Sequence, residues 1–265
     1  MPNSTPSATL RLERDGEIAW IIADNPARMN ALTALMWKTL PDLLADAERD
    51  DTIRVIVLRG AGERAFSAGA DISEFESART GENAAKYDAL NHAAFTALSG
   101  CTKPTITMIH GFCLGGGLGL ALCTDIRLAD EKAEFAIPAA KLGLGYNARW
   151  VRPLLAAVPP SRAKEMLFTG RRFKVTEAAT MGLVNGVVEA DKLKDAVRAL
   201  AQEIAANAPL TVRAAKQVID EIVRHPETPN MAALDAAVVA CFNSEDYAEG
   251  RRAFLEKRKP RFQGR

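Results

Sequence analysis

The stretch FCLGGGLGLALCTD, residues Phe112–Asp125, places four glycines within five positions directly before an apolar run. A helix is predicted to begin there, where side chains are almost absent. Glycines at a helix start let a ligand approach the backbone, where unpaired N–H groups stabilise developing negative charge. This description fits an oxyanion hole. Close packing of the helix against a strand is the alternative, and the glycines alone favour that alternative.

Two other glycine-rich sites are excluded by spacing. A dinucleotide-binding loop would need its third glycine at Leu120, and no phosphate-loop lysine follows the glycines.

Strands and helices alternate on both sides of this stretch. Residues 9–24 indicate a hairpin that turns at Asp15–Gly16. Thr33 can cap a following helix, which Pro41 is expected to kink or break. The alternation predicts an α/β core with parallel strands. Further strands are predicted within 53–60, 105–111 and 125–130, and a further helix over 82–100.

Only helices are predicted after about residue 190. No linker, repeat or low-complexity segment separates them from the rest of the chain. We therefore interpret residues 1–190 as an α/β core and residues 191–265 as a helical appendage. The predicted helices cover roughly 191–207, 210–224, 230–242 and 244–257.

The composition excludes several classes of function. The 265 residues include 34 basic and 33 acidic side chains, so a formal charge of +1 provides no field to attract nucleic acid or an anionic membrane. The four cysteines lack paired or metal-ligand spacing, which is typical of thiols in a reducing compartment. The sequence shows no targeting pattern or membrane span. We therefore expect a cytoplasmic protein without a metal, nucleic-acid or membrane partner.

A second run of small residues lies in RAFSAGADISEF, residues 64–75. It offers a turn at Ala68–Gly69–Ala70, and Asp71 stands in a position typical of a helix cap. The two turns could each direct one N–H group at the same oxygen atom. The segment AFSAG is also one residue away from a nucleophile elbow, so Ser67 is an alternative, serine-hydrolase nucleophile. The only histidines that could activate it are His92, His110 and His225.

Together, FSAGADI and GGGLGLAL resemble the paired motifs of the enoyl-CoA hydratase/isomerase, or crotonase, superfamily. The resemblance implies a crotonase-like α/β fold, a spiral of β-β-α units with a C-terminal helical trimerisation region. It also implies an acyl-CoA substrate, no cofactor beyond the CoA of that substrate, and a homotrimer or homohexamer. Further motifs in the matching order are NPARMNAL, EMLFTGRRF, AATMGLVNGVV and SEDYAEGRRAFLEKRKPRF.

The resemblance also implies roles for individual residues. The backbone N–H groups of Ala70 and Gly116 would act in catalysis by binding the thioester oxygen, and one such donor is worth roughly 3 to 4 kcal/mol of the barrier. Asp71 is expected to act as a helix cap rather than as a catalyst. Contacts to CoA are implied at or around Arg28, Ala68, Asp71, Ile72, Phe254 and Lys257.

The sequence departs from the hydratase pattern at two positions. Hydratases of this family have glutamates where this chain has Gly119 and Ala139. Hydration and isomerisation need an acid–base group, whereas decarboxylation of a malonyl-type thioester needs only a stabilised enolate. The departure therefore favours a decarboxylase-like reaction.

The run AKLGLGYNARW and the C-terminal motif resemble the methylmalonyl-CoA decarboxylase branch of the superfamily. This resemblance implies that Tyr146 orients the reacting carboxylate or protonates the enolate. That branch has a histidine in place of Ala70 and a glutamate in place of Gly119. Two alternatives stay open, a hydratase or isomerase with other acid–base groups and a non-catalytic acyl-CoA-binding protein.

Overall fold

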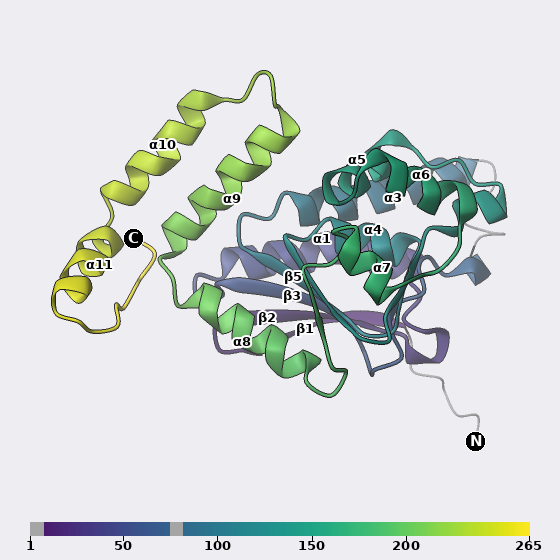
Figure 1. Ribbon diagram of the computed structural model, residues 1–265, viewed down its shortest axis with the longest axis horizontal. Coiled ribbons are helices and arrows are strands. Elements are labelled where there is room, and N and C mark those ends of the chain that lie inside the picture. Colours follow the sequence, from purple (N-terminus) through teal and green to yellow (C-terminus); the bar gives the residue numbers. More distant parts are fainter. Residues whose placement is uncertain (1–7, 75–81) are drawn as a thin grey trace.

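The computed structural model describes residues 8–74 and 82–265, and two β-sheets lie at its centre (Figure 1). The larger sheet has the strand order β1-β2-β3-β5-β7-β10, and the smaller has the order β4-β6-β8-β9. The predicted α/β core is confirmed, although residues 1–7 and 75–81 of it lie outside the described residues. The strands are β1 (Thr9–Asp15), β2 (Ile18–Asp24), β3 (Val55–Gly60), β4 (Ala65–Ser67), β5 (Thr105–Ile109), β6 (Phe112–Leu114), β7 (Ile126–Asp130), β8 (Glu134–Ala136), β9 (Phe173–Lys174) and β10 (Gly186–Val188).

The predicted hairpin is confirmed. β1 and β2 pair antiparallel over their whole length, and Gly16 makes the turn between them with a φ of +59°. From β2 onward, neighbouring strands of the larger sheet pair in parallel. β2, β3 and β5 are buried along nearly their whole length, as parallel strands are when both faces of the sheet are covered.

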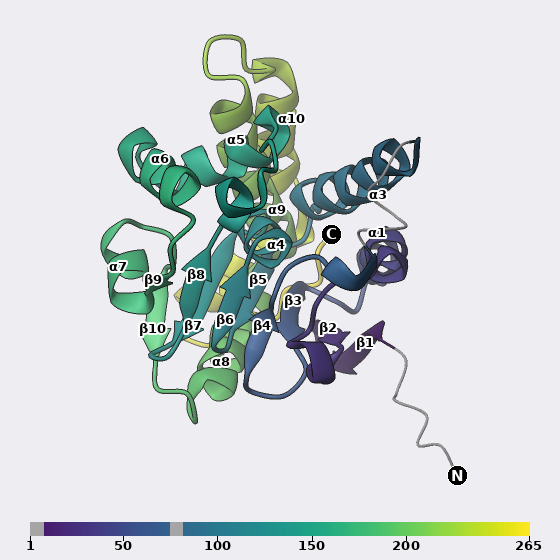
Figure 2. The ribbon, with the colours of Figure 1, turned by 90° about the vertical axis from the view of Figure 1, so that its right-hand side faces the viewer.

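Three consecutive units repeat one order: a strand of the larger sheet, a strand of the smaller sheet, and helical structure. β3 leads to β4 and α3, β5 to β6 and α4, and β7 to β8 and α5, and Figure 2 shows the small strands beside one another. The repetition confirms the predicted spiral of β-β-α units. The helices of this part are α1 (Ala34–Arg49), α3 (Glu82–Ser99), α4 (Gly116–Leu122), α5 (Ala148–Ala157), α6 (Pro160–Thr169) and α7 (Val175–Thr180), with short 3-10 turns η1 (Pro26–Arg28), η2 (Ile72–Glu74) and η3 (Pro138–Leu142).

Helix α1 begins as predicted but continues through its proline. Thr33 Oγ1 accepts the N–H of Met36 at 3.3 Å and caps the helix. The break expected at Pro41 is absent, because a proline removes only one backbone donor. Trp37 and Leu44 are each 1% exposed, so tertiary packing holds the turns on both sides of the proline.

Two apolar clusters cover the larger sheet on its two faces. One cluster is shared by both sheets, α1, α3 and α4. On the other face, Leu193 and Val197 of α8 pack against Trp20, Val57 and Met108. Helix α8 therefore belongs to the packed core although it follows residue 190. The division into a core of residues 1–190 and an appendage of residues 191–265 stays a prediction.

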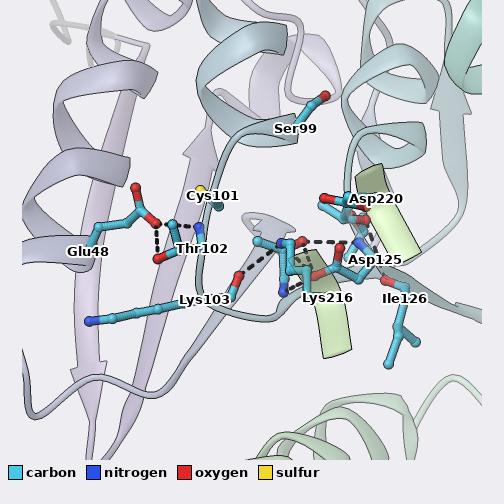
Figure 3. Close-up of polar contacts among 12 residues, drawn as sticks. Glu48, Ser99, Cys101, Thr102, Lys103, Asp125, Ile126, Lys216 and Asp220 are labelled. Atoms are coloured by element: carbon cyan, nitrogen blue, oxygen red, sulfur yellow. Dashed lines mark hydrogen bonds and ion pairs between the residues drawn. The ribbon is translucent and has the colours of Figure 1, made fainter. Parts of the chain in front are cut away.

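The last three helices extend away from the core (Figure 1). Lys216 of α9 fastens them to it, since its Nζ donates to Asp125 Oδ2 at 2.8 Å and to the Lys103 carbonyl at 3.0 Å (Figure 3). In the described part of the chain, the helices lack the combination of length and apolar character that crossing a membrane requires. The helices predicted after residue 190 are confirmed as α8 (Leu193–Ala205), α9 (Pro209–Arg224), α10 (Met231–Phe242) and α11 (Glu245–Leu255).

Arg54, just before β3, joins the core to the end of the chain. Its Nη1 donates to the Ala205 carbonyl at 2.8 Å and its Nη2 to the Phe262 carbonyl at 2.6 Å. Asp246 of α11 is 2% exposed and accepts the backbone N–H groups of residues 263 and 264 at 2.6 and 2.8 Å. The residues after α11 are thereby fixed between α11 and the larger sheet.

Candidate active site

Two backbone N–H groups from the two small-residue turns lie side by side. A methyl group added to Gly116 would lie 3.6 Å from the Ala70 nitrogen, and one added to Gly69 would lie 3.3 Å from the Gly116 nitrogen. Within residues 8–74 and 82–265, neither the Ala70 nor the Gly116 N–H has a hydrogen-bond acceptor. Unpaired backbone donors are rare inside proteins. These two groups, the donor pair, are close together and without hydrogen-bond partners among the described residues, as two donors to one oxygen atom must be.

The loop that carries NPARMNAL holds the turn around Ala70. The N–H of Leu32 donates to the Gly69 carbonyl at 2.7 Å, and the N–H of Asp71 donates to the Leu32 carbonyl at 2.9 Å. Asn30 is 1% exposed and donates to the Ala65 carbonyl at 2.7 Å. These bonds fix the residues on both sides of Ala70 and leave its own N–H unused.

Ser67 supports this turn instead of acting as a nucleophile. Its Oγ donates to the Asn30 carbonyl at 2.8 Å and accepts the N–H of Gly69 at 3.1 Å. Ser67 is 1% exposed, and His110 is paired with Asp130 at 3.1 Å. Because the hydroxyl is buried and already hydrogen-bonded in both roles, the serine-hydrolase alternative has no support in this geometry.

The glycines at the start of α4 have different surroundings. Gly115 has a φ of +49°, a conformation that glycine adopts without strain. A methyl group added to Gly117 would lie 2.6 Å from Ser67 Cβ, so α4 packs on β4 with no room for a side chain. Gly116 instead faces Trp37 and the Ala70 nitrogen. Close packing is therefore found at Gly117, while the role of the Gly116 N–H as an oxyanion donor stays a prediction.

Gly117→Ala is expected to lower the free energy of unfolding by about 1 to 3 kcal/mol, because the new methyl group overpacks the contact with Ser67. For a chain of this length, each kcal/mol lowers Tm by about 2 to 4 °C. Gly116→Ala is the matched control, since its methyl group comes no closer than 3.1 Å to the Trp37 ring and 3.6 Å to the Ala70 nitrogen. Thermal melting compares the two variants, and equal Tm values would contradict the packing argument.

Aromatic rings line the site beyond Gly116. The ring centroids of Trp37 and Phe95 are 5.6 Å apart, those of Phe95 and Trp150 are 6.4 Å apart, and those of Trp150 and Tyr146 are 5.4 Å apart. All three pairs are edge-to-face, the arrangement that aromatic quadrupoles favour. The sequence analysis gave a role only to Tyr146 of these four residues. Trp150 ends the same run AKLGLGYNARW, whereas Trp37 and Phe95 come from separate helices that no sequence motif connects.

The two positions that carry glutamate in hydratases hold no acid–base group here. A methyl group added to Gly119 would lie 2.9 Å from Phe95 Cζ, so the Phe95 ring fills the space that a longer side chain would need. Ala139 lies in η3 and is 6% exposed. The surroundings of Gly119 are therefore aromatic instead of acidic.

Tyr146 lies just before α5 and is half-buried against the larger apolar cluster. Burial raises the pKa of its phenol, and a negative charge on Cys123 would act in the same direction. The hydroxyl therefore stays protonated at neutral pH. Tyr146 can donate a hydrogen bond or a proton, but it does not serve as a base.

Four residues expected to contact CoA lie around one turn beside the donor pair. Arg28 Nη1 contacts both carboxylate oxygens of Asp71, at 2.8 and 2.9 Å. Asp71 caps η2 by accepting the N–H of Ser73 at 3.0 Å. Burial of Asp71 opposes its ionisation, but hydrogen bonds from Ser73 and Arg28 hold the pKa of its carboxyl below its ordinary value. Ile72 is exposed and Ala68 is partly exposed next to this pair.

The other two residues expected to contact CoA lie elsewhere. Phe254 is 84% exposed on α11, and Lys257 follows the end of that helix with a φ of +51°. In Figure 1, helix α11 lies at the far left of the molecule, whereas helix α4 lies well away from it, within the core. A single chain therefore does not bring Phe254 and Lys257 to its own donor pair.

Comparison with known sequences decides the family. The sequence profile of the enoyl-CoA hydratase/isomerase family matches residues 13–265. This chain belongs to the enoyl-CoA hydratase/isomerase family. It is therefore an enzyme that acts on acyl-CoA thioesters.

Relatives within the family are similar along nearly the whole chain. The short-chain-enoyl-CoA hydratase of Clostridium acetobutylicum is 35% identical over 248 residues, which are 94% of this chain and 95% of the relative. The carnitinyl-CoA dehydratase of Proteus mirabilis is 36% identical over 264 residues, 98% of this chain and all of the relative. Neither of these relatives is named as a decarboxylase, so the likeness to the decarboxylase branch stays a prediction.

Solved structures of the family share the fold. The crystal structure of an enoyl-CoA hydratase/carnitine racemase from Magnetospirillum magneticum has a TM-score of 0.93 and 39% identity, covering 97% of this chain and 96% of that one. An enoyl-CoA hydratase/isomerase family protein from Hyphomonas neptunium has a TM-score of 0.92 and 40% identity, with coverages of 97% and 98%. The crotonase-like fold expected from the sequence is confirmed.

Proposed function

We propose that this enzyme stabilises the enolate of a malonyl-type acyl-CoA thioester and releases carbon dioxide from it. The observation that carries the proposal is the donor pair beside aromatic rings, where Gly119 and Ala139 supply no carboxylate. An enolate oxygen gains more from preorganised N–H groups than the ground-state carbonyl does, so the donor pair lowers the barrier. The reaction needs no cofactor beyond the CoA of the substrate.

The reaction balances without a protein base. The bond between the α-carbon and the carboxylate breaks, carbon dioxide leaves, and the electron pair moves into the thioester to form the enolate. The negative charge thus moves from a carboxylate near aromatic rings, which solvate it poorly, to an oxygen at the donor pair. A proton then reaches the α-carbon from the Tyr146 hydroxyl, directly or through water, and the phenolate regains a proton from solvent, so each turnover consumes one solvent proton.

Incubation with methylmalonyl-CoA and malonyl-CoA tests the proposal. Release of carbon dioxide together with an equal amount of propionyl-CoA or acetyl-CoA, measured by mass spectrometry, is the expected result. Hydration of an enoyl-CoA without any decarboxylation would identify the enzyme as a hydratase with other acid–base groups. Tight binding without turnover of any thioester would indicate a non-catalytic acyl-CoA-binding protein.

Hydration is the second candidate, because the relatives described above carry the names of a hydratase and a dehydratase. The unaltered enzyme is expected to hydrate crotonyl-CoA at least about a hundredfold more slowly than a hydratase with both glutamates, since acid–base groups contribute about 10²- to 10⁴-fold. Loss of absorbance by the conjugated thioester measures the rate. Brisk hydration by the unaltered enzyme would contradict the decarboxylase-like proposal.

Restoring hydration is expected to need three changes, Gly119→Glu, Ala139→Glu and Phe95→Ala. The third is required because the Phe95 ring occupies the space at Gly119. The matched control carries glutamine in place of both new glutamates, which keeps their size and removes their acid–base chemistry. A rate no higher than that of this control would show that the two positions do not determine the reaction.

We infer that the enzyme assembles as a homotrimer or homohexamer. Phe254 and Lys257 would then reach the CoA bound by another protomer, which is consistent with their distance from the donor pair of their own chain. Helix α10 presents apolar side chains that a partner would cover, namely Met231, Val238, Val239 and Phe242.

Light scattering at working concentration is expected to give three or six times the mass of one chain. Val239→Glu places a charge on the exposed apolar face and is expected to lower this mass, whereas Lys257→Gln, outside α10, serves as the control. A monomer for the unaltered protein would overturn both the assembly and the shared CoA site.

A further inference from the structure

A large cavity lies beyond the aromatic rings. It has a volume of about 880 Å³ and is bounded by α3, α5, the C-terminal end of α4, and α9. Ala70 and Gly116 are not among the described residues that line it. The residues used in the argument below are Phe95, Thr96, Cys123, Trp150, Ile219 and Val223.

Hydrogen bonds hold the walls of this cavity in place. Lys216 Nζ ties α9 to Asp125 and to the Lys103 carbonyl, as Figure 3 shows. The Lys216 side chain is only 11% exposed, so these bonds lie largely out of water. Arg152 of α5 donates to the Arg224 carbonyl at the end of α9. The cavity between α5 and α9 is therefore a fixed feature of the fold.

The Phe95 ring stands between the donor pair and this cavity. Gly116, Gly119 and Cys123 follow one another on one face of α4, because they are spaced by three and four residues. Gly116 belongs to the donor pair, and Cys123 lines the cavity. Between them, the Phe95 ring approaches Gly119 so closely that an added methyl group would lie 2.9 Å from its Cζ. The direct way along α4 is closed at Phe95.

The geometry of α4 gives the length of acyl chain that would reach Phe95. A rise of about 1.5 Å per residue puts Gly119 about 4.5 Å and Cys123 about 10 Å from Gly116. Three bonds of an extended chain span about 3.5 Å, so these distances correspond to roughly four and nine bonds. An acyl group of about four carbons ends before Phe95, and one of about eight carbons would have to pass it.

We propose that Phe95 restricts the enzyme to thioesters of short acyl groups, of about four carbons or fewer. The inference rests on the proposed function, in which the donor pair holds the thioester oxygen. Phe95 acts as a barrier, and its removal connects the donor pair to a cavity, lined by apolar and charged side chains, that has room for a longer chain. Ile219 and Val223 of α9 would then contact the end of that chain.

Binding of saturated thioesters tests the proposal without requiring turnover. Calorimetry gives Kd for propionyl-CoA and for octanoyl-CoA. The unaltered enzyme is expected to bind octanoyl-CoA no more tightly than propionyl-CoA. In Phe95→Ala, octanoyl-CoA is expected to gain at least about tenfold in affinity relative to propionyl-CoA, since each buried methylene is worth about fourfold. Phe95→Leu keeps an apolar side chain in the core and is expected to give a smaller gain.

Thr96→Ala is the matched control. Thr96 is the next residue of α3 and also lines the cavity, so its truncation enlarges the cavity without removing the barrier. The ratio of the two Kd values is expected to stay unchanged in this variant.

Two results would overturn the role of Phe95. They are tighter binding of octanoyl-CoA than of propionyl-CoA by the unaltered enzyme, and an unchanged ratio in both Phe95 variants. Neither result bears on the proposed decarboxylation, which is measured by release of carbon dioxide. Failure of the unaltered enzyme to bind any thioester would instead overturn the proposed function and this inference together.

Discussion

Replacing Gly116 by proline is expected to lower kcat/KM by about a hundredfold or more, the usual effect of losing one oxyanion donor. Proline has no N–H, so the donor pair is reduced to Ala70 alone. The backbone should accept the change, because Gly116 is the first residue of α4 and does not have a positive φ. The preceding Gly115 has a φ of +49° and a ψ of −119°, the mirror image of the extended conformation found before proline, and glycine, which lacks a Cβ, adopts both.

Gly116→Ala separates the loss of the donor from the added bulk. Both variants carry a Cβ that meets Trp37 at 3.1 Å, but only alanine keeps the N–H. Gly116→Ala is therefore expected to keep most of the kcat/KM that Gly116→Pro loses. Thermal melting checks that both variants are folded. Similar values of kcat/KM for Gly116→Pro and Gly116→Ala would show that the Gly116 N–H is not an oxyanion donor.

Tyr146→Phe is expected to lower kcat by about a hundredfold with little change in the affinity for CoA thioesters. The substitution keeps the ring against Trp150 and removes only the hydroxyl that orients the carboxylate or protonates the enolate. A raised pKa keeps the phenol protonated as the pH rises, so ionisation of Tyr146 is not expected to lower the rate between about pH 7 and 10.

Tyr247→Phe is the matched control, because this second tyrosine lies on α11 against Phe242. Its rate is expected to equal that of the unaltered enzyme. Full activity of Tyr146→Phe on the best substrate would reject the decarboxylase-like mechanism. The acid–base group would then have to lie elsewhere in the site.

Much of the fold could be predicted because local signals agree with tertiary packing. The hairpin at Gly16, the cap at Thr33 and the four helices after residue 190 follow from turn residues and apolar periodicity. The strands of the smaller sheet were not predicted as a group, since β4, β6 and β8 have three residues each and show no periodicity. The break offered at Pro41 is absent, because packing of the surrounding turns outweighs the loss of one backbone bond, whereas the kink offered as the other outcome stays a prediction.

The donor pair could be proposed from sequence because two runs of small residues each followed a predicted strand. The aromatic rings could not, because Trp37, Phe95 and Trp150 come from three helices and meet only in the folded chain. The sequence showed that Gly119 lacks a carboxylate. Only the structure shows that a phenyl ring from another helix takes up the space beside it.

The hydrogen bonds of Arg54 also constrain the order in which the protein folds during synthesis. Its two carbonyl partners lie 151 and 208 residues further along the chain, so one bond must wait until residue 205 has left the ribosome and the other until residue 262 has. Loop closure over such distances is slow compared with the formation of local helices. We expect the sheets to form first and the residues after α11 to attach last, and until then the N-terminal end of β3 stays open to solvent and to other chains.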